Sequence, residues 1–130
     1  MIVIAGDNFQ NNFKKGATAL IILLFLQDGD MYGYQISQMM KERSDGDFSV
    51  PEGSLYPALY KLIEQGYISD EKRQVGKRLT RVYYHLETAG REHLRQLMSD
   101  YLTVKRGIER IIERSGGEII SDQGNESGFK

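Results

Sequence analysis

The sequence predicts a mainly α-helical fold with a small two-stranded β-hairpin and a long C-terminal helix. Apolar residues recur at helical spacing in three segments before residue 66, which predicts three helices. Apolar and polar side chains then alternate from Thr80 to Leu86, as expected of a half-buried strand. From Leu94 to Ile111, apolar residues fall alternately three and four apart, which is the seam of a helix that pairs with another helix.

Composition and charge exclude several classes of protein. The 130 residues suit one domain, and 40% hydrophobic residues are enough for a core. Cysteine is absent, which excludes disulfides and cysteine-bound metals and favours a cytoplasmic location. The longest apolar run, Ala17 to Leu26, is shorter than the roughly 18 residues of a membrane span, so no membrane insertion is expected. The net charge of -1 gives no global indication of nucleic-acid binding.

No arrangement of residues indicates catalysis, a metal or a cofactor. His85 and His93 lie on different predicted elements, and no second ligand stands at metal spacing. The sequence has no glycine-rich phosphate loop and no nucleophile motif. We therefore expect neither an enzyme nor a cofactor-binding protein.

The first predicted helix begins at Lys14, after an N-terminal arm of residues 1–13. It is apolar on nearly all faces, and a domain this small can hardly cover such a helix alone, which favours a second subunit. A short amphipathic helix is expected from Tyr32 to Arg43. A third helix follows from about Glu52 to Gln65, and Gly66 ends it.

Two strands joined by a basic tip are predicted next. They cover Tyr67 to Asp70 and Thr80 to Leu86, and the segment Gln74 to Arg78 joins them. Five basic residues and no acidic residue lie between Lys72 and Leu86, so charge is segregated although the total is nearly zero. In the second strand, alternation predicts that Val82, Tyr84 and Leu86 face the core while Arg81, Tyr83 and His85 face out.

The last helix is expected over residues 87–114. Its apolar seam lies on one side of an otherwise polar surface, and such a seam needs a partner helix. Gly107 weakens this helix by roughly 1 kcal/mol and is a candidate bend. The polar tail of residues 115–130 is expected to be disordered.

This order of three helices, a basic hairpin and a long helix is typical of a winged helix-turn-helix domain. In such domains the third helix reads a DNA groove and the hairpin, called the wing, contacts phosphate. The order assigns residues 14–86 to a winged helix-turn-helix DNA-binding domain and residues 87–114 to a C-terminal dimerisation helix.

Four motifs add to this order. They are Tyr32-Gly33-Tyr34-Gln35-Ile36, Gly53-Ser54-Leu55-Tyr56-Pro57-Ala58-Leu59, Leu62 through Gly66-Tyr67-Ile68, and Tyr83-Tyr84 with Leu86 and Gly90 after it. Together they resemble the PadR-like family of transcriptional regulators over about Lys14 to Ile112. The resemblance implies a dimeric cytoplasmic DNA-binding regulator, usually a repressor, in which the last helix and the first make the dimer. The chain departs from the family at Glu87 followed by Thr88, and in the longer wing segment Gly76 to Val82.

The candidate DNA contacts lie on the third helix, at the start of the second and on the wing. A helix N-terminus approaches the duplex closely and favours phosphate, and basic wing residues neutralise phosphates. Tyr56 and Tyr60 either bond phosphate through their hydroxyls or pack on the second helix. Of Tyr32 and Tyr34, the resemblance favours one near the DNA backbone and the other packed. The expected contacts are Tyr32, Gly53, Ser54, Tyr56, Pro57, Lys61, Lys77, Arg78, Arg81 and Tyr83.

We expect a homodimeric repressor whose partners are double-stranded DNA with an inverted-repeat operator, a second copy of the chain and a small aromatic or apolar effector. The candidate effector contacts are Phe25, Met98 and Tyr101, although Tyr101 filling the core is the simpler interpretation. The alternative is a winged-helix module that binds another protein and little or no DNA, which the acidic net charge favours. The expected dimer residues are Leu20, Leu24, Leu94, Leu97, Tyr101, Val104, Ile108 and Ile111.

Overall fold

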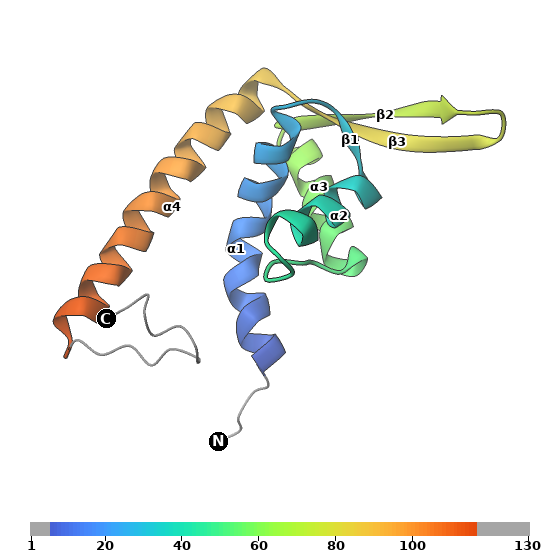
Figure 1. Cartoon of the computed structure of the whole chain (residues 1–130). Helices are drawn as coiled ribbons and strands as arrows, with labels where there is room; N and C mark the ends of the chain where they lie inside the picture. The colour runs from blue at the N-terminus through green and yellow to red at the C-terminus, as the bar shows by residue number, and fades with distance from the viewer. Residues whose placement is uncertain (1–5, 117–130) are drawn as a thin grey trace. The chain divides into compact units, whose positions relative to one another are not determined.

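The computed structural model describes the backbone of residues 6–116 and the side chains of residues 14–116. Helices and a three-stranded antiparallel sheet follow one another along this part of the chain (Figure 1). The elements are α1 (Gly6–Leu26), β1 (Met31–Tyr32), α2 (Gly33–Arg43), α3 (Glu52–Glu64), β2 (Ile68–Val75), β3 (Leu79–Leu86) and α4 (Thr88–Arg114). The predicted fold class, mainly helical with a small β wing, is confirmed. None of the helices described between residues 6 and 116 is long and apolar enough to cross a membrane.

α1 begins at Gly6 rather than at Lys14, so the prediction of an arm over residues 1–13 is wrong from residue 6 onward. The segment contains no proline, and a helix that has already nucleated extends through each polar residue at a cost below about 0.7 kcal/mol. Phe9 and Phe13 stand four apart, as on one face of a helix, but two apolar residues among polar ones give no sustained period, so the sequence did not indicate that the helix extends back to Gly6. Residues 1–5 and most of the predicted tail, residues 117–130, lie outside the described residues.

The sheet has one strand more than predicted. β1 is only two residues long, too short to show alternation, and it pairs antiparallel with β3. β2 continues to Val75 rather than ending at Asp70, because its charged half pairs with β3 as far as Leu79. The strand order is β1-β3-β2, and Figure 1 shows the β2–β3 hairpin extending from the helices. This hairpin is the wing.

The core lies among α1, α2, α3 and one face of the sheet. Ile22, Leu23, Ile36, Leu55 and Leu59 have no exposed surface, and burial of each such side chain contributes roughly 1.5–3 kcal/mol. The predicted inward residues of the second strand are confirmed at two positions, since Tyr84 and Leu86 are buried while Val82 is half-buried.

The start of α4 belongs to the unit that contains the sheet. Contacts divide the chain into one unit that ends at Arg95 and another that begins at Gln96, rather than at the expected boundary between residues 86 and 87. Close packing explains the difference. A Cβ at Gly90 would overlap the Tyr67 carbonyl, and the His93 ring stacks on the Tyr67 ring with centroids 4.1 Å apart. We call the unit that ends at Arg95 the head.

Candidate nucleic-acid interface

α3 is fixed to the head by one apolar face and leaves the opposite face open. Leu55, Leu59 and Leu62 are buried, whereas Gly53 and Tyr60 are exposed. Exposed residues also include Pro57, Lys61 and Glu64. The open face of α3 is therefore available to a partner such as a DNA groove, whose width of about 12 Å admits a helix.

Pro57 lies past the first turn of α3. Its missing N–H leaves the Gly53 carbonyl without the donor that an α-helix would otherwise supply from residue 57. Proline costs least in the first turn of a helix, so Pro57 lowers the stability of α3 at this position. Both residues are exposed, so water can satisfy the carbonyl in the free protein.

Tyr56 packs on the start of α2. Its hydroxyl and ring lie where a Cβ at Gly33 would stand, so residue 33 must be glycine for the two helices to approach. Partial burial raises the pKa of Tyr56 above its ordinary value of 10.0, and Glu52 and Tyr60 raise it further. Of the two interpretations of Tyr56, these contacts favour packing on the second helix, whereas Tyr60 remains exposed.

The wing tip carries two exposed cations. Lys77 and Arg78 follow Gly76, whose φ of 73° is the left-handed conformation that glycine accepts readily. The Gln74 side-chain amide donates to the carbonyls of Gly76 and Lys77 at 3.2 and 3.3 Å, which fixes the tip. Lys77 and Arg78 thus extend from an ordered turn and are accessible to phosphate.

The base of the wing is a stack of aromatic and cationic side chains. The rings of Tyr32 and Tyr83 meet edge to face with centroids 5.4 Å apart. The Arg81 guanidinium lies 4.2 Å from the Tyr32 centroid, and that of Arg73 lies 4.5 Å from the Tyr83 centroid. Of the expected wing contacts, Arg81 and Tyr83 therefore lie in this stack with Tyr32, while Tyr34 is the exposed tyrosine at the start of α2.

Asp30 ties the stack to the turn after α1. One carboxylate oxygen accepts from Arg73 at 2.6 Å, and the other lies 2.7 Å from His85 Nδ1. These partners, His85 first, lower the pKa of Asp30 below its ordinary value of 3.8 although burial opposes the shift. The sequence did not indicate Asp30 or Arg73, because their positions are far apart in the chain and only the register of the sheet joins them.

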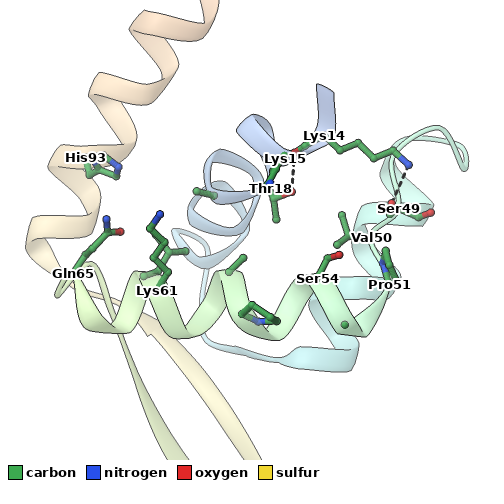
Figure 2. Close-up of a pocket in the computed structure, with 15 residues that line it drawn as sticks. Lys14, Lys15, Thr18, Ser49, Val50, Pro51, Ser54, Lys61, Gln65 and His93 are labelled. Atoms are coloured by element: carbon green, nitrogen blue, oxygen red, sulfur yellow. Dashed lines mark hydrogen bonds between the residues drawn. The ribbon is translucent and has the colours of Figure 1, made fainter. Parts of the chain in front are cut away.

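A basic groove borders α3 on the side of α1. It encloses about 680 Å³, and Figure 2 shows side chains from α1, α3, the loop before α3 and the start of α4 around it. Four of the predicted DNA contacts line this groove: Gly53, Ser54, Pro57 and Lys61. Lys14 and Lys15 line it as well, and the sequence did not single them out as contacts.

The expected dimer residues divide into two groups. Leu20 and Leu94 are buried within one chain, so they have little surface left for a partner, and Leu24 and Leu97 are half-buried. The other four are exposed: Tyr101, Val104, Ile108 and Ile111. These four lie on α4 beyond the head, which is where an apolar stripe remains uncovered in a single chain.

The expected effector residues line no part of the groove in Figure 2. Phe25 is buried, and the Arg43 guanidinium lies 5.5 Å from its ring centroid. Met98 is half-buried and Tyr101 is exposed. Among the described residues, no group of three or more histidine, aspartate or glutamate side chains is placed to hold a metal ion.

Comparisons with known proteins agree with this geometry. The sequence model of the transcriptional regulator PadR-like family matches residues 22–96, more than half of the chain. A transcriptional regulator from Mycobacterium tuberculosis is 29% identical over 116 residues, which are 89% of this chain and 94% of that protein. The negative transcriptional regulator PadR from Bacillus subtilis is 32% identical over 73 residues, which are 56% of this chain and 40% of that protein.

Solved structures show the same fold. A transcriptional regulator from Clostridium thermocellum matches with a TM-score of 0.73 and 29% identity, over 78% of this chain and 98% of that chain. A protein from Streptococcus mutans matches with a TM-score of 0.66 and 35% identity, over 83% of this chain and 94% of that chain.

Proposed function

The chain belongs to the PadR-like family of transcriptional regulators, and on this basis we propose that it acts as a homodimeric repressor that binds an inverted-repeat operator. As a member of this family it is a DNA-binding transcriptional regulator and not an enzyme. The proposal adds the sign of regulation, the dimer, the operator and a cytoplasmic site of action.

One observation carries the proposal: the open face of α3 and the basic wing tip belong to the same head. α3 has the width to enter a major groove, and its exposed face carries Lys61. Lys77 and Arg78 at the wing tip supply charge for the flanking phosphates, and no acidic residue lies between Lys72 and Leu86. The acidic total charge does not oppose phosphate contact by the wing tip, because the acid-free segment Lys72 to Leu86 carries it, whereas the open face of α3 holds Glu64 beside Lys61.

The exposed stripe of α4 supports the dimer. Val104, Ile108 and Ile111 are each more than half exposed in the single chain, and they follow the spacing of a helix seam. A second copy of α4 would cover this stripe. Two α3 helices related by a two-fold axis would then enter successive major grooves about 34 Å apart, which explains the choice of an inverted repeat.

An effector would regulate such a repressor by binding one arrangement of the two heads better than the other. Met98 and the exposed Tyr101 on α4 remain the candidate contacts for a small aromatic or apolar effector, and the buried Phe25 would contribute only if it became accessible. Perturbation of the side-chain resonances of these residues by a ligand would support this part of the proposal.

Fluorescence anisotropy with two duplexes tests the DNA-binding proposal. One duplex comes from the region upstream of the protein's own gene, and an unrelated duplex of the same length is the control. We expect tighter binding to the upstream duplex, by roughly a thousandfold or more where it contains the operator. A folded, dimeric protein that binds neither duplex would contradict the proposal and favour a protein-binding winged helix.

A further inference from the structure

The basic groove between α1 and α3 has a lining of one charge sign. Lys14 and Lys15 border it from α1 and Lys61 borders it from α3, with His93 at the end nearest α4 (Figure 2). None of the residues that line the groove is acidic. Its remaining lining is uncharged: Val50, Pro57 and Ala58 are apolar, Ser54 and Thr18 bear hydroxyls, and Gln65 bears an amide. A groove of this kind suits an extended anion with neutral parts between its charges.

We propose that this groove holds the sugar-phosphate backbone of one DNA strand. Lys15 and Lys61 contact its phosphates, and Lys14 positions the loop before α3. The inference rests on the proposed DNA binding and assigns it a further contact surface on α1. The expected partner is the sugar-phosphate backbone of double-stranded DNA, which is read without regard to base sequence.

The width of a major groove places a strand on each side of α3. A helix with its side chains is about 10–12 Å wide and the groove is about 12 Å wide, so phosphates must run along both flanks of an inserted helix. On one flank Tyr56 faces Gly33 at the start of α2, where Tyr34 is exposed. On the other flank α3 borders the basic groove with Ser54 and Lys61. One strand therefore meets the start of α2 and the other meets α1.

Lys15 and Lys14 have different roles in this arrangement. Lys15 is exposed at the groove, so its ammonium is free to contact a phosphate. The Lys14 ammonium donates to the Ser49 carbonyl at 3.1 Å (Figure 2). It also lies 6.0 Å from the centroid of the Phe48 ring. These contacts hold the loop that leads into α3. Lys14 therefore affects DNA binding by positioning α3.

Charge also selects DNA over a second copy of the chain as the occupant. A second copy would have to bring acidic side chains to neutralise the lysines, and the α4 stripe that the proposed dimer uses has none at Val104, Ile108 and Ile111. A phosphate backbone supplies the complementary charge at regular spacing. The groove is also continuous with the α3 face that the proposed function places against the bases.

The salt dependence of DNA binding tests this inference with matched lysine variants. Lys15→Ala and Lys61→Ala remove cations from the groove, and Lys41→Ala removes an exposed cation from the last turn of α2 as the control. For each groove variant we expect the slope of log affinity against log salt to fall by about 0.9, with about eightfold weaker binding at about 0.1 M salt. The loss should be the same for the upstream and the unrelated duplex, and Lys41→Ala should match the wild type.

Lys14→Ala gives a second readout. Because Lys14 positions the loop before α3, this variant should lower the ratio of upstream to unrelated affinity, which Lys15→Ala leaves unchanged. Lys14→Arg, which keeps a donor for the Ser49 carbonyl, should restore most of the ratio. A merely destabilising effect would instead lower the melting temperature and the active fraction without changing the ratio.

Two results would overturn the inference. If the wild type binds DNA while Lys15→Ala and Lys61→Ala behave like Lys41→Ala, the proposed function stands and the groove assignment fails. If the groove variants change the oligomeric state rather than the salt slope, the groove contacts a second copy. Failure of the wild type to bind any duplex would refute the proposed function as well, so the two failures are distinguishable.

Discussion

Tyr56 on α3 occupies the space that any side chain at Gly33 on α2 would need. This contact sets how closely the two helices approach at the end where α2 begins and where α3 exposes its first turns. The contact also holds the Tyr56 hydroxyl against the start of α2, where Tyr34 is exposed beside Gly33. The two residues thus join the packing of the head to the geometry of its proposed interface.

Gly33→Ala is expected to destabilise the head. A methyl group at residue 33 would overlap the Tyr56 ring, and overpacking of this kind typically costs about 1–3 kcal/mol in the free energy of unfolding. Thermal or urea unfolding measures the loss. Gly16→Ala in α1 is the matched control, because no atom lies within 4 Å of a Cβ there, and it should be neutral or stabilising. Equal destabilisation by both variants would contradict the contact.

Asp30 is expected to make stability fall at acidic pH. Its pKa is below 3.8 in the folded protein, so the carboxylate contributes stability that is fully present above the unfolded value and is lost as the pH falls through the folded value. Asp30→Asn removes this contribution. Melting temperatures measured from about pH 6 to about pH 2 should show a wild-type advantage near pH 6 that shrinks in acid. A constant difference across this range would contradict the prediction.

Ile108→Lys is expected to give a folded monomer. Ile108 is exposed in the single chain, so a lysine there should leave the head folded. In the proposed dimer, two paired α4 helices would have to bury the lysine's charge. Analytical ultracentrifugation measures the mass, and tight DNA binding should be lost with the dimer. Thr103→Lys places the same charge on α4 away from the stripe and should leave the dimer intact. A dimeric Ile108→Lys protein would refute this interface.

Periodic features of the sequence predicted the order of the elements and much of the core. The second helix, the third helix and the alternation at Tyr84 and Leu86 depend on local patterns that burial preserves. β1 was not predicted because two residues carry no period, and the charged half of β2 was not predicted because its pairing with β3, rather than apolar alternation, makes it a strand. The helical residues before Lys14 were not predicted because Phe9 and Phe13, four apart among polar residues, are too few to show a sustained period.

The candidate site was predicted in part. Lys77 and Arg78 were predicted at the wing tip from the local cluster of basic residues and the turn glycine before them, and the structure places them there. Arg81 was expected to face out, yet its stacking on Tyr32 depends on a strand pair that joins residues far apart in the sequence. The basic groove was not predicted at all, since its lysines come from α1 and α3 and only tertiary packing brings them to one cavity.

The salt dependence of binding by a wing variant tests the central claim most directly. Lys77→Ala/Arg78→Ala removes both cations of the tip, and Arg106→Ala/Arg110→Ala removes two exposed cations from α4 as the control. We predict that the wing variant lowers the slope of log affinity against log salt by about 1.8 relative to the wild type, while the control leaves it unchanged. An unchanged slope in the wing variant, from folded protein, would contradict DNA binding through this winged helix.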